Sequence, residues 1–493
     1  MLDEKDFRNA ADALYRMLPS VNEVLLRAPL SQLDLSNGHR ERVVGAIRRS
    51  LNRARSEIAQ GMHSSLSLEK LVDELPMRVA QEMRTDAEFS LRRVINAAGV
   101  ILHTNLGRAP LSEMALDHLR EVAAGYSNLE FDLMRGERGK RDSHVESLLL
   151  ALLAGTASSQ PEQARRAVIV NNCAAATFLA LHALARGRQV LVSRAELIEI
   201  GGGFRIPEIL EESGAVLREV GTTNRTRVSD YERAITPETA LVLRVHQSNF
   251  SMEGFVERPG LDELIALGKR TSIGVFEDQG TGLVESLDPY GVRGEPTFAA
   301  SLSSGCDLVA ASGDKLFGGP QCGILVGRRE WIDRIRSSPL FRTFRADKLS
   351  YAALEATLIQ YLYGVPESIP VIRMLRMPED AIRRRCAYIA DAVHSTDLSV
   401  NVTGVLSVIG GGTAPKSTLP SHALALKHAC LDASALLAAL RQLDPPIIGR
   451  IEDDQVLLDL RTVEQEFDEF LISALSRAFS LGATLENRVD DAR

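Results

Sequence analysis

Cysteine is scarce in this sequence, and its spacing excludes the usual cysteine-based frameworks. The 493 residues include five cysteines, an odd number with no CxxC pair: Cys173, Cys306, Cys322, Cys386 and Cys430. Disulfide-stabilised domains and structural zinc sites depend on paired or closely spaced cysteines. We therefore expect neither disulfides nor a bound metal, and this cysteine usage fits a reducing cytoplasm.

Long apolar runs are also missing. The chain starts with the charged segment MLDEKDF, and its most apolar run, residues 148–157, is only about ten residues long, whereas a membrane-spanning helix needs about 20. A secretory signal needs an apolar core after its first residues. The sequence therefore predicts a cytoplasmic protein with no membrane partner.

An excess of basic residues is missing as well. The chain has 57 Lys and Arg residues against 65 Asp and Glu residues, a formal net charge of −8 at pH 7. A protein that coats nucleic acids needs a basic surface to neutralise phosphates. The balance argues against such a general role, although it leaves room for one local basic patch.

One segment near the N-terminus has such a local excess. Residues 36–55 (SNGHRERVVGAIRRSLNRAR) contain a single acidic residue, Glu41, and six arginines: Arg40, Arg42, Arg48, Arg49, Arg53 and Arg55. On a helix this density places several guanidinium groups on one side, which suits contact with a polyanion. A solvated helix face explains the pattern equally well. Residues 1–75 as a whole carry 11 basic and 11 acidic residues, so only the segment is basic.

The pattern of apolar residues changes twice along the chain. Residues 3–75 follow helical spacing, with an interruption at Pro19-Ser20. From about residue 87, short β-branched segments alternate with helix-length stretches, which is typical of parallel strands joined by helices in an α/β domain. After about residue 347 the pattern becomes α+β. We predict three domains: 1–86, helical; 87–346, α/β and catalytic; 347–493, a smaller α+β domain.

Individual elements follow from the same pattern. The expected strands of the α/β domain are residues 167–170, 190–192, 215–220, 241–245, 273–276, 308–311 and 324–326, with a helix at 174–185. In the smaller domain we expect helices at 351–361, 433–443 and 464–479 and strands at 398–402, 405–409 and 456–460.

The strongest local signal is a lysine in a glycine-rich loop, SGDKLFGGPQ at residues 312–321, between two predicted strands. Glycines let the backbone approach a ligand closely. If Lys315 is enclosed beside a ligand, its pKa falls and the neutral amine becomes available for a Schiff base. The alternative is a hairpin turn with an exposed lysine.

Two more strand ends carry polar side chains. Asp278 ends a strand in the segment FEDQGTG and could pair with a protonated pyridine nitrogen or simply cap a turn. The segment VHQSN places His246, Ser248 and Asn249 after another strand, where they could contact a ring face or its phenolic oxygen. A histidine at a strand end is also common for purely structural reasons.

A third strand end suits a phosphate. Residues 170–177 (VNNCAAAT) end a strand and begin a helix of small residues, whose N-terminus offers free N–H groups to an anion. A tight turn would favour the same small residues. The order along the chain, phosphate helix, His/Asn strand, Asp strand and Lys strand, is the order found in fold-type I pyridoxal phosphate enzymes.

Six motifs together resemble the bacterial L-seryl-tRNA(Sec) selenium transferase family, also called selenocysteine synthases. They are LPSVNEVL (18–25), INAAGVILHTNLGRAPLS (95–112), YSNLEFDLMRGERGKR (126–141), ELIEIGGGFRIPEIL (196–210), VGTTNRT (220–226) and SGDKLFGGPQCGILVG (312–327). The resemblance runs from about residue 15 to about residue 485. It implies a fold-type I pyridoxal phosphate (PLP)-dependent transferase, aspartate aminotransferase-like, with an N-terminal helical domain and a C-terminal α+β domain.

The resemblance also assigns residues. It implies that Lys315 is the PLP lysine and Asp278 the partner of the pyridine nitrogen. The remaining cofactor contacts are Asn172, Cys173, Ala174 and Ala175 around the phosphate, together with His246, Ser248 and Asn249. Cys173 is interpreted as a small residue, not as a nucleophile. The implied oxyanion-binding residues are Arg108, Thr222, Thr223 and Arg342, with interdomain salt bridges as the alternative, less favoured role of the two arginines.

The implied reaction replaces the seryl β-hydroxyl group by selenium on L-seryl-tRNA(Sec). Selenophosphate would add to a dehydroalanyl intermediate after β-elimination, giving L-selenocysteinyl-tRNA(Sec). The N-terminal domain would bind tRNA through the arginines of residues 40–55, by shape and phosphate contacts. The resemblance further implies a homo-oligomer built from dimers, forming a larger ring.

Two other functions are consistent with parts of the sequence. A PLP-dependent lyase or desulfurase-like enzyme acting on a free amino acid would explain Lys315 and Asp278, but not residues 1–75 or the GTTNRT segment. A non-catalytic RNA-binding protein on a PLP fold would not need the lysine, the aspartate and the glycine loop together.

Overall fold

The computed structural model describes residues 12–32, 39–87, 89–154, 165–200, 203–247, 249–415 and 417–477. The chain divides into two compact units, residues 1–93 and 94–493. The predicted helical residues 3–11 and 33–38, and the last two residues of the predicted helix at 464–479, lie outside the described residues.

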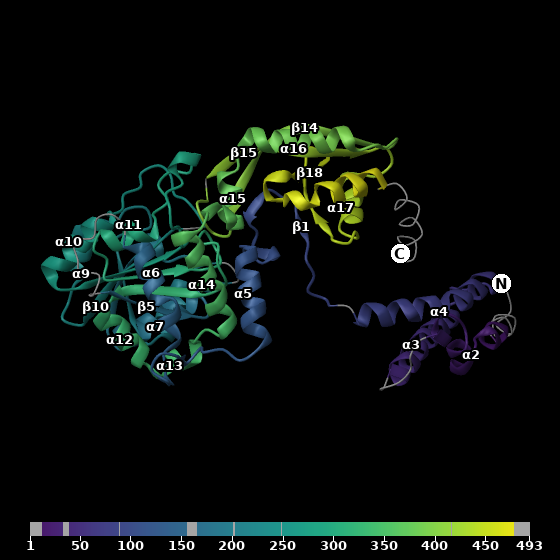
Figure 1. Ribbon diagram of the computed structural model, residues 1–493, viewed down its shortest axis with the longest axis horizontal. Coiled ribbons are helices and arrows are strands. Elements are labelled where there is room, and N and C mark those ends of the chain that lie inside the picture. Colours follow the sequence, from purple (N-terminus) through teal and green to yellow (C-terminus); the bar gives the residue numbers. More distant parts are fainter. Residues whose placement is uncertain are drawn as a thin grey trace. The chain divides into compact units, whose positions relative to one another are not determined.

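The first unit is helical, as predicted, with α2 (Val21–Leu25), α3 (His39–Ala59) and α4 (Ser65–Ala87). The predicted interruption at Pro19-Ser20 is the start of α2. Ser20 caps this helix: its Oγ accepts from the N–H of Glu23, and its own N–H donates to Glu23 Oε2 at 2.6 Å. Apolar residues of α3 and α4 share one core, which explains why these two helices form. Figure 1 shows the two helices next to each other.

The second unit is built around a seven-stranded sheet. Its order is β5 (Arg165–Val170), β13 (Gly323–Arg328), β12 (Leu308–Ser312), β11 (Gly274–Gly280), β10 (Thr239–Val245), β6 (Gln189–Ser193) and β9 (Val216–Val220). All seven predicted strands are present. The expectation of parallel pairing is wrong for β13, which runs antiparallel to β12 and β5. The loop 313–322 holds no crossover helix, which a parallel connection between β12 and β13 would need.

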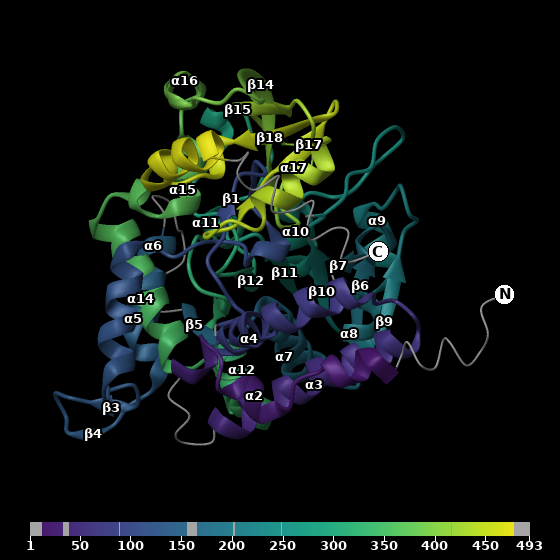
Figure 2. The same ribbon diagram turned by 90° about the vertical axis from the view of Figure 1, so that its right-hand side faces the viewer.

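Helices cover both faces of this sheet (Figures 1 and 2). One face packs against α7 (Cys173–Ala185), α8 (Ile206–Glu212) and α12 (Arg329–Ser337). The other packs against α6 (Glu146–Leu153), α9 (Val228–Ala234), α10 (Leu261–Thr271), α11 (Phe298–Ser303) and α14 (Lys348–Tyr363). In β5, Ala167 and Ile169 face one core and Val168 and Val170 the other, the alternation expected of a strand buried on both sides.

A five-stranded sheet is the second large sheet of this unit. Its order is β17 (Arg450–Glu452), β18 (Gln455–Asp459), β15 (Thr418–His428), β14 (Leu398–Gly410) and β2 (Val100–Leu102). Helices α16 (Glu379–Ala392) and α17 (Ala433–Leu440) pack on it. The two strands predicted at 398–402 and 405–409 are one continuous strand, β14, because Gly404 stays paired with His422 instead of making a turn.

Strand β2 lies in the range predicted for the catalytic domain but pairs with β14 of the smaller sheet. The ranges 1–86, 87–346 and 347–493 otherwise stay predictions. Within the described parts of the chain, no helix is both long and apolar enough to cross a membrane. The same residues contain no group of three His, Cys, Asp or Glu side chains arranged to hold a metal ion.

Candidate active site

Lys315 and Asp278 lie at the same edge of the large sheet. Strands β11 and β12 are parallel, with Asp278 opposite Ala310, and Lys315 follows the end of β12. Both side chains are buried, each in a residue only 8% exposed. The strands on either side of the lysine loop are antiparallel, as the hairpin alternative required, but that alternative is wrong about the lysine, which is enclosed.

Burial favours the neutral form of both the Lys315 amine and the Asp278 carboxyl group. It lowers the pKa of the Lys315 ammonium group, and the nearby Arg108 lowers it further, while Cys173 and Asp278 oppose that shift. Burial raises the pKa of the Asp278 carboxyl group, and a hydrogen bond from Thr177 opposes this effect. The site therefore favours a neutral amine beside an acid whose charge depends on its donors.

The first turns of α7 are tied to Asp278. Asn172 caps the helix, its Oδ1 accepting from the N–H of Ala175 at 2.8 Å. Thr177 Oγ1 donates to Asp278 Oδ2 at 3.0 Å, and Cys173 Sγ donates to Oδ1 at 3.6 Å. Burial holds the pKa of the Cys173 thiol well above its usual value, so it acts as a donor and stays protonated. The predicted phosphate-binding helix start thus lies next to the predicted catalytic residues.

Arg108 is held against the lysine loop. Its Nη1 donates to Asp314 Oδ2 at 2.8 Å, and Ser312 Oγ donates to Asp314 Oδ1 at 2.6 Å. The backbone N–H of Ala109 also donates to the Asp314 carbonyl at 3.2 Å. Arg108 has a left-handed backbone, φ 64°, a conformation that a non-glycine residue adopts only when its surroundings hold it there. Asp314 was missed by sequence reasoning, and its position beside Lys315 was the only available signal.

His246 faces a glutamate that sequence reasoning also missed. Its Nδ1 lies 3.8 Å from Glu295 Oε1, and neither atom has a hydrogen-bond partner within the described residues. Burial lowers the pKa of His246 to about 4, helped by Arg244 and Arg258. Burial raises the pKa of Glu295 to about 7. No motif surrounds Glu295, so only the three-dimensional contact reveals it.

A buried ion pair fixes the strand end that carries His246. Arg244 Nη1 donates to Glu196 Oε1 at 2.6 Å, and the N–H of Val245 donates to Glu196 Oε2 at 3.0 Å. Gln247 Nε2 donates to the Ala195 carbonyl at 2.7 Å. The segment after β10 is therefore anchored to the segment after β6, which restricts the positions available to the histidine.

The remaining predicted residues are more dispersed. Asn249 is exposed, and its Nδ2 donates to the Glu199 carbonyl at 2.7 Å; Ser248 lies outside the described residues. Thr222 and Thr223 are exposed on the loop after β9. Four strand spacings separate β9 from β12, or roughly 19 Å at about 4.8 Å each. Within one chain, these threonines are not brought to Lys315.

Arg342 lies on the short helix α13 (Pro339–Phe344) and is exposed. The end of this helix is next to the phosphate-binding segment, because the N–H of Asn171 donates to the Phe344 carbonyl at 2.9 Å. Arg108, by contrast, makes the ion pair with Asp314 described above, within residues 94–493. The structure therefore holds Arg108 beside the lysine loop in an ion pair and places Arg342 on an exposed helix whose end adjoins the phosphate-binding segment.

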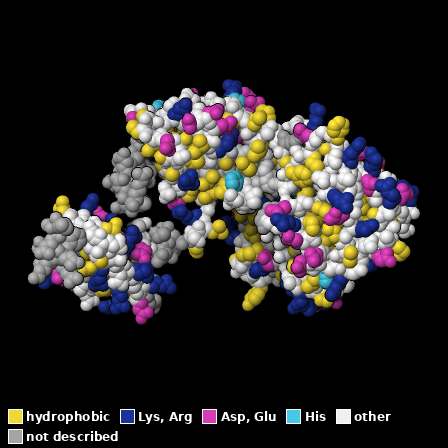
Figure 3. Space-filling view, turned by 180° about the vertical axis from the view of Figure 1, so that it is seen from behind, with side chains coloured by type: hydrophobic (Ala, Val, Ile, Leu, Met, Phe, Trp, Pro, Cys, Tyr) yellow, Lys and Arg dark blue, Asp and Glu magenta, His cyan; other side chains and the backbone are white. Residues whose placement is uncertain are grey.

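The six arginines predicted to bind RNA all belong to α3 and are all exposed. The buried face of this helix consists of Val43, Ala46, Ile47, Leu51, Ala54 and Ile58. Arg49 pairs with Glu82 of α4 at 2.5 Å and Arg53 with Glu57 at 3.0 Å. Figure 3 shows basic side chains gathered along the lower side of the first unit. A solvated face and a polyanion-binding face both fit this arrangement.

The residues at the lysine edge fit the cofactor predicted from the sequence. An enclosed amine suits a carbonyl partner, and a buried carboxyl group with two donors suits a pyridinium nitrogen. The capped start of α7 suits a phosphate. His246 Nδ1 and Glu295 Oε1 are buried without hydrogen-bond partners within the described residues, as expected of polar atoms that line a ligand site.

Comparisons with known proteins point to one family. The family model described as "SelA: L-seryl-tRNA selenium transferase" matches residues 94–464. The chain is 43% identical over 426 residues to the L-seryl-tRNA(Sec) selenium transferase of Aquifex aeolicus, covering 86% of this chain and 91% of that protein. It is 42% identical over 470 residues to the protein of the same name from Geobacter metallireducens, covering 94% and 99%.

Among solved structures, the chain is similar to D-glucosaminate-6-phosphate ammonia-lyase. The TM-score is 0.55 at 18% sequence identity, covering 82% of this chain and 99% of that chain. At this identity, the likeness concerns the fold alone.

Proposed function

The chain belongs to the L-seryl-tRNA selenium transferase family, and on that premise we propose how its own residues serve the reaction. It converts L-seryl-tRNA(Sec) to L-selenocysteinyl-tRNA(Sec), and its cofactor is pyridoxal 5′-phosphate on a fold-type I scaffold. The observation that carries the residue assignment is the enclosed Lys315 beside Asp278 at the carboxyl edge of the sheet. The cytoplasmic location stays a prediction.

We assign the cofactor site to the residues at that edge. When bound, PLP supplies an electron sink for negative charge that develops at the substrate Cα. Lys315 holds the cofactor and then takes the Cα proton at Nζ, because burial keeps a fraction of its amine neutral. Asp278 accepts from the protonated ring nitrogen, and Thr177 and Cys173 hold its carboxylate in place. The free N–H groups at the start of α7 bind the phosphate.

His246 completes this site as a contact to the cofactor ring. Its partly buried position after β10 supports this assignment, as does its buried Nδ1, which has no hydrogen-bond partner within the described residues. The roles predicted for Ser248 and Asn249 stay predictions, and the hydrogen bond of Asn249 to Glu199 points to a bracing role for that side chain.

Selenophosphate is the proposed selenium donor, bound by Arg108, Thr222, Thr223 and Arg342. A dianion suits arginine forks and threonine hydroxyls. The two threonines are roughly 19 Å from the lysine strand of their own chain, by strand spacing, so they would serve the Lys315 site of another copy. This separation supports a homo-oligomer in which active sites are shared, consistent with the dimer-built ring that the sequence predicts.

The N-terminal unit is the proposed tRNA-binding domain. The alignment with the Geobacter protein covers 94% of this chain, so it includes most of residues 1–93. An enzyme that acts on a free amino acid would have no evident use for this unit. Six exposed arginines on one helix supply phosphate contacts that do not depend on base identity.

The decisive experiment supplies both substrates to the purified protein. The full chain should show the visible absorbance of lysine-bound PLP and should form selenocysteinyl-tRNA from seryl-tRNA(Sec) and selenophosphate. Lys315→Ala should lose the absorbance and product formation while retaining tRNA affinity, whereas Lys269→Ala, at an exposed position on α10, should change neither. Turnover of free serine, with indifference to the charged tRNA, would instead support the lyase alternative.

A second experiment tests the helical domain. Replacing Arg48, Arg49 and Arg53 by alanine should weaken tRNA binding and flatten its salt dependence, by roughly 0.7 to 0.9 in log–log slope for each arginine–phosphate interaction removed. The matched control replaces Arg120, Arg383 and Arg384, three exposed arginines of the second unit that each pair with a nearby aspartate. An unchanged slope in the α3 variant would remove these arginines from the RNA interface.

A further inference from the structure

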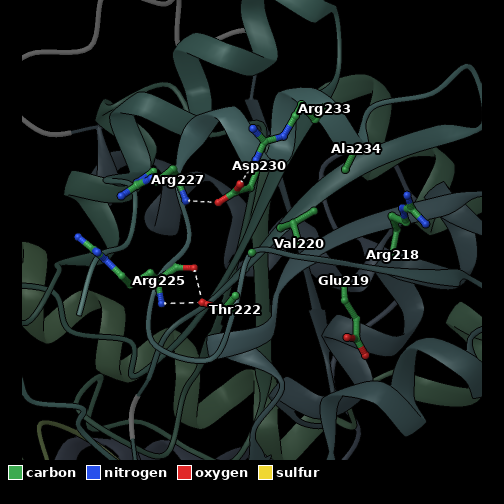
Figure 4. Close-up of a pocket in the computed structure, with 10 residues that line it drawn as sticks. Arg218, Glu219, Val220, Thr222, Arg225, Arg227, Asp230, Arg233 and Ala234 are labelled. Carbon is green, nitrogen blue, oxygen red and sulfur yellow. Dashed lines mark hydrogen bonds and ion pairs between the residues drawn. The ribbon is translucent and has the colours of Figure 1, made fainter. Parts of the chain in front are cut away.

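A cleft of about 500 Å³ lies beside the edge strand β9, between that strand, the loop that follows it and α9. Its lining residues are Arg218, Glu219, Val220, Gly221, Thr222, Arg225, Arg227, Asp230, Arg233 and Ala234 (Figure 4). We call it the β9 cleft. One of these residues, Thr222, is also a proposed oxyanion contact, so the cleft adjoins the proposed oxyanion-binding residues.

The cleft is locally basic in a chain whose net charge is −8. Its arginines are Arg218, Arg225, Arg227 and Arg233, and Arg194 adjoins them by pairing with Glu219 at 2.7 Å. Glu257 accepts from both Arg225, at 3.0 Å, and Arg227, at 3.1 Å. Five guanidinium groups therefore share three carboxylates: Glu219, Asp230 and Glu257. The local excess is positive, and it can attract a polyanion.

The guanidinium groups are accessible and spread apart. The side chains of Arg225, Arg227 and Arg233 are 51%, 56% and 74% exposed. Figure 4 shows Arg218 on one side of the cleft and Arg225 and Arg227 on the other, with no convergence on a single point. A single phosphate is usually held by donors that point to one centre, whereas an extended chain of phosphates is matched by separated cations.

The loop between β9 and α9, which carries Arg225 and Arg227, is held in a fixed shape. Gly221 has φ 67°, and a Cβ there would lie 2.3 Å from Thr226 Oγ1, so only glycine fits. Thr226 is fully buried and hydrogen-bonds Ser193 Oγ at 2.8 Å. Thr222 Oγ1 donates to the Arg225 carbonyl at 2.9 Å. A loop fixed in this way presents its side chains without first having to be ordered, which favours binding.

We propose that the β9 cleft binds the sugar–phosphate backbone of the tRNA substrate, next to the end that carries the amino acid. A substrate whose reacting end lies near Thr222 places its neighbouring phosphates along the cleft, toward Arg218 and Arg233. This inference rests on the proposed function, because it takes the ligand to be the RNA of the acylated substrate. It adds to the α3 arginines a second RNA contact, within the catalytic unit.

The test uses the full-length PLP-bound protein and a fluorescently labelled, unacylated tRNA(Sec) transcript. The double variant Arg218→Gln/Arg233→Gln removes two charges; within the described residues Arg218 makes no ion pair and Arg233 pairs only with Asp230, three residues away on the same helix. The control Arg120→Gln/Arg384→Gln removes the same charge elsewhere in the unit. Affinity is measured by anisotropy from about 0.05 to about 0.3 M salt, a range over which the Debye length falls by more than half.

The expected result is a fall in log–log salt slope of about 1.4 to 1.8 and a roughly 25- to 60-fold weaker affinity at about 0.1 M salt, with the control unchanged. Retained PLP absorbance and melting temperature confirm folding; if the double variant melts early, Arg218→Gln alone should give half the slope change. An unchanged slope overturns the proposal, as does a loss of inorganic phosphate binding with tRNA affinity intact. Failure of the unsubstituted protein to bind tRNA would overturn the proposed function as well. An unchanged slope in the double variant, with tRNA binding by the unsubstituted protein intact, would overturn only the role of the β9 cleft.

Discussion

Thr177→Val isolates the contribution of one hydroxyl group to the cofactor site. Thr177 is buried, and its Oγ1 donates to Asp278 Oδ2 at 3.0 Å. Valine keeps the shape of the side chain but removes the donor, which also removes the hydrogen bond that opposes the raised pKa of Asp278. A hydrogen bond to a charged group contributes about 1.5 to 3 kcal/mol. We therefore expect the affinity for PLP to fall by about 10- to 100-fold.

The effect of Thr177→Val on PLP affinity should also depend on pH. A further rise in the pKa of Asp278 extends the pH range in which the carboxyl group is neutral and cannot pair with a protonated ring nitrogen. The loss of affinity should therefore grow as the pH falls. Titration of the cofactor-free protein with PLP, followed by visible absorbance at several pH values, measures both effects.

The control is Thr271→Val, which removes a hydroxyl-to-carbonyl hydrogen bond at the end of α10, near the opposite end of β11. It should leave PLP affinity unchanged. Equal PLP affinity in Thr177→Val and the unsubstituted protein, at every pH, would refute the view that donors to Asp278 hold its charge for the cofactor.

Three further predictions concern buried polar groups and a close backbone contact. In the cofactor-free chain, the pKa of Glu295 is raised to about 7 from 4.5, so the free energy of unfolding falls as pH rises from 4.5 to 7. The lowered pKa of His246 opposes this trend between about 4 and 6.5. Glu295→Gln should therefore gain stability relative to the unsubstituted chain as pH rises from 4.5 to 7, by on the order of 3 kcal/mol, measured by urea denaturation. A difference that stays flat with pH would contradict the assignment. Asp459→Ala should lower the free energy of unfolding by about 3 to 5 kcal/mol, because the fully buried carboxylate accepts hydrogen bonds from Ser407 and Ser421, each at 2.7 Å. A change in melting temperature no larger than that of a surface substitution would count against this prediction. Gly323→Ala places a Cβ 2.2 Å from the carbonyl oxygen of the helix-capping Asn172 and should weaken PLP binding. Gly404→Ala, whose Cβ would meet no atom within 4 Å, should leave PLP binding unchanged. Equal PLP affinity in the two variants would argue against the close contact at Gly323.

Local patterns were sufficient to predict the strands of the large sheet and the residues at their ends. Lys315, Asp278 and the helix start at Asn172 each follow an apolar run. In an α/β sheet, the ends of parallel strands share one edge, so their meeting could be expected before any coordinates were known. The exception, antiparallel β13, depends on what the loop 313–322 contains, which strand patterns do not encode.

Contacts between distant segments could not be predicted from the sequence. Glu295 meets His246 through a loop without a motif, and Asp314 gains its role only because Arg108 docks on it. The wide separation of Thr222 from Lys315 depends on strand order, which a single sequence leaves open. The predicted break at residues 403–404 does not occur, because pairing with β15 keeps β14 continuous there.

The path of residues 100–108 links the two sheets mechanically. Val100–Leu102 form the edge strand of the smaller sheet, and Arg108 is bonded to Asp314 beside Lys315 in the larger part. Only residues 103–107 lie between these two anchors, and they form a compact turn that ends at Gly107, φ 89°. A rotation of the smaller sheet must therefore be absorbed in this turn or transmitted to Arg108. If the turn keeps its shape, tilting the smaller sheet would move the Arg108 guanidinium group relative to Lys315.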